Sequence, residues 1–103
     1  MAQVVIQMTQ RDIDHGVPGD PCTCPVARAL KRAFQERRVS AGEGYIWVGP
    51  SSRRMTWRTP GTVRYFISKF DEGQPVEPFD FALGDELRVP FSDVDKPFSQ
   101  HRG

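Results

Sequence analysis

Cys22 and Cys24 lie on either side of one threonine and directly before Pro25, a residue typical of the first position of a helix. A thiol at a helix N-terminus ionises more easily than a free thiol, and zinc favours cysteine and histidine ligands. With His15 near in sequence, a thiol- or metal-dependent enzyme that uses Cys24 is one hypothesis. The sequence has no second cysteine pair, however. The spacing therefore favours a small buried Cys24 and an incidental loop thiol at Cys22.

Arginine and aromatic residues are interleaved between positions 45 and 58. Arginine binds phosphate or carboxylate through paired N–H groups, and aromatic rings stack on nucleotide bases. The segment therefore predicts a site for an anionic, nucleotide-like ligand. Its expected members are Trp47, Trp57, Ser51, Ser52, Arg53, Arg54 and Arg58. In the alternative, both Trp side chains belong to the core and the arginines only solvate the outer surface.

Side-chain alternation separates the two faces of the strand that this segment predicts. Tyr45 and Trp47 fall on one face, and Ile46 and Val48 fall on the other. Helices must cover one of these faces. If the aromatic face is the one left open, it is a binding surface.

Catalytic motifs are missing from the sequence: it contains no G-x-S-x-G, no phosphate-binding glycine loop and no H-E-x-x-H. Cys24 and His15 are the only conceivable nucleophile and base, and no third residue is placed to orient them. We therefore expect a protein without enzymatic activity, cofactor or metal.

Composition limits the partners. The 103 residues suit one domain, and 14 basic against 13 acidic residues give a net charge of +1. Such a balance creates no global field toward nucleic acid or membrane. The sequence shows neither a signal peptide nor an apolar run long enough to span a bilayer, so we expect a cytoplasmic protein without a membrane partner.

Periodicity predicts the order strand, helix, strand, strand, helix, strand. Between the first strand and the first of these helices, Thr9-Gln10-Arg11-Asp12 resembles a short helical turn capped by Thr9 that stops at Gly16. The order of strands and helices is the split β-α-β, or ferredoxin-like, order of an α+β fold, with two helices on one face of an antiparallel sheet. Another strand order with the same elements remains open. We expect one domain over residues 1–90 and a loosely ordered tail over 91–103. The predicted elements cover residues 2–9, 9–16, 25–38, 45–49, 53–58, 60–71 and 78–83.

Two groups of residues, Cys24-Pro25-Val26-Ala27 and Phe70-Asp71-x-Gly73 with Pro78-Phe79-x-Phe81, carry a resemblance. On them the chain resembles a group of short bacteriophage and prophage proteins to which no activity is attached. The resemblance implies a small accessory protein that binds a host protein, a nucleic acid or a nucleotide.

The leading hypothesis is a host-directed antagonist that occludes a protein partner or captures an anionic ligand. The runner-up is a single-stranded nucleic-acid-binding module, because aromatic residues on an open sheet can stack bases. We also expect a homodimer, since proline-flanked edge strands and a Phe-rich C-terminal segment leave apolar surface that two helices cannot readily cover.

Overall fold

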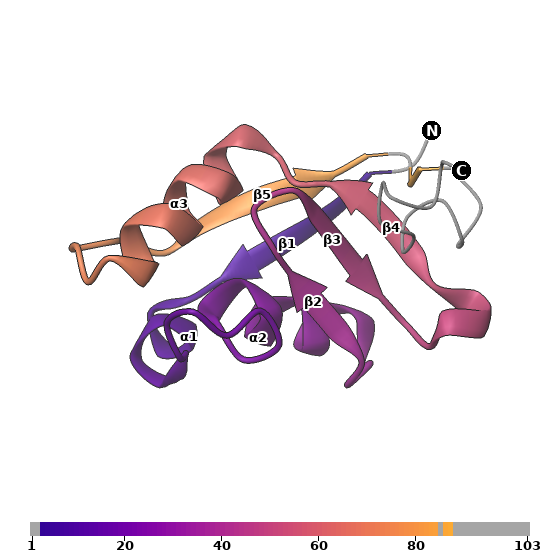
Figure 1. The fold of residues 1–103 in the computed structure, drawn as a ribbon, viewed down its shortest axis with the longest axis horizontal. Coiled ribbons are helices and arrows are strands. Elements are labelled where there is room, and N and C mark those ends of the chain that lie inside the picture. Colours follow the sequence, from indigo (N-terminus) through magenta and orange to yellow (C-terminus); the bar gives the residue numbers. More distant parts are fainter. Residues whose placement is uncertain (1–2, 85, 88–103) are drawn as a thin grey trace, which may run out of the picture.

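The computed structural model describes residues 3–84, 86 and 87, which form helices and two antiparallel sheets (Figure 1). The predicted α+β class is confirmed. Residues 91–103, the expected tail, lie outside the described residues. In chain order the elements are β1 (Val4–Met8), α1 (Gln10–His15), α2 (Pro25–Phe34), β2 (Val39–Ala41), β3 (Tyr45–Val48), the 3-10 turn η1 (Ser51–Arg53), β4 (Met55–Arg58), α3 (Gly61–Asp71) and β5 (Phe79–Leu83).

The first sheet pairs β1 with β5, so that Ile6 lies opposite Phe81. The face that carries these two residues is buried, whereas Val5 and Asp80 on the opposite face are exposed. Helix α2 contacts β1. Helix α3 runs beside β5, with the ring centroids of Phe66 and Phe79 5.5 Å apart (Figure 1). Alternation within the strands thus gives the helices one apolar face to cover.

The second sheet has the order β2-β3-β4. Ile46 lies opposite both Ala41 and Trp57, and all three side chains are buried. Trp57 also meets Phe34 of α2 at a centroid distance of 5.6 Å. This face of the sheet belongs to the core, and the face that carries Trp47 is the outer one.

The predicted ferredoxin-like order, with all strands in one sheet, is not confirmed. Within the described residues, β4 exchanges hydrogen bonds with the chain that follows β5, where the expected order would place β1. The Leu87 backbone N–H donates to Thr56 O at 2.7 Å, and the Trp57 ring N–H donates to Gly84 O at 3.0 Å. These bonds join the end of the first sheet to the edge of the second.

Strand β2 was not predicted, because the helical pattern in the sequence continues to Arg38. The helix ends at Phe34 instead, since Gln35 adopts a left-handed conformation with φ 54° and its N–H bonds to Lys31 O. Residues 35–38 turn the chain, and Val39–Ala41 then pairs with β3. The expected helix end was therefore wrong by one turn.

One face of α2 supplies the centre of the core. Leu30 and Val26 are fully buried, and Ala27 and Ala29 let the helix approach the sheets closely. The helical spacing of the apolar residues predicts a buried face with Val26, Leu30, Ala33 and Phe34. Val26 and Leu30 confirm it, whereas Phe34 is only partly buried and Ala33 is exposed.

Asp12 is a fully buried carboxylate that joins β1, α1 and α2. It closes a capping box with Thr9, whose backbone N–H donates to Asp12 Oδ2 at 2.9 Å. Arg32 of α2 donates to both carboxylate oxygens, at 2.9 and 2.8 Å, and also to Gln7 O at the end of β1. Burial alone would raise the pKa of Asp12, but the hydrogen bonds from Arg32 and Thr9 outweigh it and hold the pKa below its ordinary value.

Replacing Asp12 with Asn should lower the free energy of unfolding at pH 7 by about 2 to 3 kcal/mol, less than the full cost of breaking a buried ion pair because Arg32 is half exposed. Because the folded pKa of Asp12 is depressed, its contribution is complete above the ordinary carboxyl pKa of about 3.9 and is lost as the pH falls through the lower folded value. Urea denaturation from pH 7 to pH 2 measures both effects.

The matched control is Asp14→Asn, on the same helix, where the carboxylate is exposed and accepts a hydrogen bond from Gln10. It should change stability by less than about 0.5 kcal/mol. A constant difference between the wild type and Asp12→Asn down to pH 2 would contradict this role of the carboxylate.

Candidate functional site

The outer face of the second sheet combines two aromatic rings with two guanidinium groups. Arg54 lies over Trp47, with its guanidinium carbon 3.8 Å from the ring centroid, and Arg58 lies 5.7 Å from the centroid of Tyr45. Tyr45 and Arg58 are directly opposite in the pairing of β3 with β4. We call Tyr45, Trp47, Arg54 and Arg58 the arginine–aromatic face. It presents positive charge over flat apolar rings.

The connection between β3 and β4 places Arg54 on this face. Gly49 adopts φ 106°, and a Cβ atom there would lie 3.1 Å from Arg53 O, so the bend requires glycine. The turn η1 follows, with the Arg53 backbone N–H donating to Pro50 O at 2.9 Å. Strand β4 then starts in a register that points Trp57 into the core and Arg58 outward.

The members of the arginine–aromatic face differ in exposure. Tyr45 is 43% exposed and Arg58 is exposed, whereas Trp47 and Arg54 are half-buried. The Trp47–Arg54 pair therefore forms the more buried part of this face, and Tyr45 and Arg58 form its more exposed part. An anionic group can approach Arg58 without displacing a core residue.

The structure brings together only some of the residues predicted for the site. Trp47, Arg54 and Arg58 share the arginine–aromatic face. Ser51, Ser52 and Arg53 are exposed on η1, at the tip of the hairpin. Trp57 is 5% exposed on the inner face, so it does not join Trp47. Tyr45, which alternation had already placed beside Trp47, completes the group.

Cys24 is buried at the start of α2, and Cys22 is exposed. Burial raises the pKa of the Cys24 thiol, and the carboxylates of Asp71 and Asp20 add to the increase. A helix N-terminus was expected to lower this pKa; burial outweighs that effect. Among residues 3–84, 86 and 87, no three His, Cys, Asp or Glu side chains lie close enough to hold a metal ion. The geometry thus gives Cys24 the features of a small core side chain.

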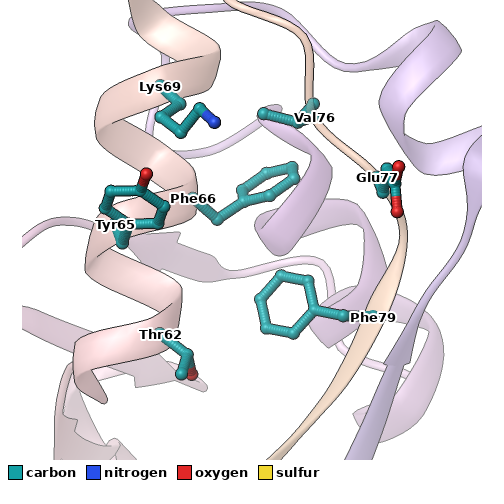
Figure 2. A pocket seen from close by; sticks show the side chains of 7 residues that line it. All are labelled: Thr62, Tyr65, Phe66, Lys69, Val76, Glu77 and Phe79. Carbon is teal, nitrogen blue, oxygen red and sulfur yellow. The ribbon is translucent and has the colours of Figure 1, made fainter.

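An apolar cavity of about 260 Å³, which the sequence analysis missed, lies between α3 and the chain that leads into β5 (Figure 2). Phe66 and Phe79 project into it from opposite sides, and Val76 lies at one end (Figure 2). Tyr65, 66% exposed, stands at its border. The sequence signals for this cavity were Val76 and Phe79 alone, which Glu77 and Pro78 separate and which fit the start of the strand equally well.

The chain matches no protein-family model, no curated protein and no solved structure. In the part of the chain that the structure describes, no helix has the length and apolar character needed to cross a membrane. The assignment of function therefore depends on the geometry of the chain itself.

The two cysteines should react at different rates with iodoacetamide at pH 7.5. The exposed Cys22 should be alkylated first, and Cys24 at least about tenfold more slowly, because burial shields its sulfur and its raised pKa keeps the thiol protonated. Mass spectrometry of the labelled protein, with and without denaturant, measures both rates.

In the Cys22→Ser variant, the remaining thiol should be slow in the folded protein and fast in denaturant. Rapid labelling of Cys24 in the folded variant would favour the thiol-enzyme alternative.

Proposed function

We propose that this protein is a non-enzymatic binding protein that captures an anionic, nucleotide-like ligand on the arginine–aromatic face. The observation that carries the proposal is the pairing of each ring on the outer face with a guanidinium group, Arg54 with Trp47 and Arg58 with Tyr45. Aromatic rings suit a base and guanidinium groups suit a phosphate, so the face can recognise both parts of a nucleotide.

Different residues of the arginine–aromatic face suit different parts of the ligand. The contact with the Trp47 ring restricts the Arg54 guanidinium, which reduces the side-chain entropy lost when a ligand binds. The more exposed Tyr45 ring offers a surface for a base, and stacking of one base contributes roughly 1 to 3 kcal/mol. Arg58, beside that ring, is placed to donate to the phosphate in a bidentate way.

Single-stranded nucleic acid is the second candidate ligand, favoured by the same exposed Tyr45 ring. A longer ligand would extend over the hairpin tip, where Arg53 is exposed and can meet a further phosphate. The resemblance to phage proteins supports a host-directed antagonist in the cytoplasm as the biological setting. The homodimer stays a prediction.

Tryptophan fluorescence tests the proposal, because the two Trp side chains lie on opposite faces of the second sheet. Titration with AMP should change the emission of Trp47, and adenosine, which lacks the phosphate, should act at least about tenfold more weakly. In Trp47→Phe the response should disappear, since Trp57 is buried beneath the sheet. A response to AMP that survives this substitution would contradict the proposed site.

A matched pair of arginine variants tests the phosphate contact. Arg58→Ala should weaken AMP binding at least about tenfold, whereas Arg64→Ala, exposed on α3, should leave it unchanged. Thermal unfolding checks that both variants fold. Equal losses in the two variants would show binding by net charge alone. A single-stranded oligonucleotide that binds more tightly than AMP, with affinity falling steeply in salt, would favour the nucleic-acid alternative.

A further inference from the structure

A second cationic region lies between α1 and α2, apart from the arginine–aromatic face. It borders an open cavity of about 560 Å³. Each ionisable side chain that lines this cavity within the described residues is basic: His15, Arg28, Lys31 and Arg32. Val17 and Thr23, from the loop between the helices, complete the lining. From the sequence alone, the basic residues of α2 fit either contacts to phosphates or a solvated helix face.

The two arginines of the cavity play different parts. Arg32 is held by the bidentate pair with Asp12 and by Gln7 O. Arg28 lies farther from the same carboxylate, with its Nε 3.5 Å from Asp12 Oδ1. This Nε is buried yet donates to no acceptor among the described residues. This Nε lies toward Asp12, whereas the Arg28 side chain lines the cavity and is 35% exposed. Arg28 is therefore the less tightly held of the two arginines.

The charges around the cavity leave a positive excess. Arg28, Lys31 and Arg32 carry three positive charges, which Asp12 and Asp20 offset in part. Asp20 does not face this cavity: it lines a separate acidic one, and a hydrogen bond from the Cys22 backbone N–H is the main reason that its pKa is lowered. The net charge of these five groups is +1. An oxyanion would find charge complementarity here.

The loop that borders the cavity is fixed before any ligand arrives. The Val17 backbone N–H donates to Thr23 O at 3.1 Å, and the Cys24 N–H donates to Asp20 O at 2.9 Å. Gly16 lies so close to Pro25 that a Cβ atom would come within 2.5 Å of the proline ring. The loop thus holds Val17, which is 47% exposed, beside the basic side chains.

We propose that this cavity binds the phosphate group of a small phosphomonoester. The Arg28 guanidinium donates to two phosphate oxygens, Lys31 supplies a second positive charge, and Val17 contacts the apolar part of the ester. Asp12 holds Arg28 through their ion pair, and Arg32, which also lines the cavity, is occupied by Asp12 and Gln7 O. This inference does not depend on the arginine–aromatic face.

Calorimetric titration with inorganic phosphate and with phenyl phosphate, in a low-salt buffer free of other oxyanions, tests the site. Phenyl phosphate should bind with a Kd below about 1 mM and more tightly than inorganic phosphate, because only the ester reaches Val17. Val17→Ser should remove that preference. Equal affinity of the two probes for the wild type, or no heat from either, would overturn the proposal.

Variants within α2 and just after its end test where the phosphate binds. Arg28→Ala should weaken phenyl phosphate binding at least about tenfold and Arg28→Lys by less, because lysine keeps the charge and loses the fork. Arg37→Ala, exposed beyond the end of α2, is the control and should keep wild-type affinity. Lys31→Ala provides a second lining variant should Arg28→Ala fail to fold. Equal losses in the lining variants and Arg37→Ala would overturn the site, whereas Arg58→Ala should leave it intact.

Discussion

The buried carboxylate of Asp12 is the interaction on which the arrangement of this protein depends. A charge removed from water must be paired and hydrogen-bonded, and Asp12 meets that demand with Thr9 on its own helix and Arg32 on the next. Since Arg32 also donates to Gln7 O, the carboxylate ties the end of β1 to both N-terminal helices. The same pairing joins α2, whose Leu30 lies in the core, to α1 and β1.

The two faces of the second sheet differ in their surroundings. The inner faces of the two sheets share one apolar core, and Trp57 connects the sheets through its ring N–H bond to Gly84 O. The outer face of β3 and β4 carries Trp47 and Tyr45 beside arginine side chains. A residue on the inner face can thus be changed only at a cost in stability, whereas Arg58 can be changed with little.

Features that neighbouring residues determine were predicted from the sequence better than features that depend on contacts between distant residues. The cap at Thr9 and the proline at the start of α2 act within one turn, and both were predicted correctly. Strand β2 was not, because its three residues depend on pairing with β3 rather than on their own pattern. Asp12 was recognised as part of a capped turn but not as buried, since its partner Arg32 lies 20 residues away. Alternation separated Tyr45 from Ile46, yet only the assembled core shows which face is outside.

The central claim is that the arginine–aromatic face captures a nucleotide-like anion. Two-dimensional ¹H–¹⁵N NMR during titration with AMP tests it most directly, because every backbone amide reports its own surroundings. The account predicts the largest shift changes at the amides of Tyr45, Trp47 and Arg58, together with the indole N–H of Trp47, while the indole N–H of Trp57 stays in place. Shifts confined to α1 and α2, or none at all, would contradict it.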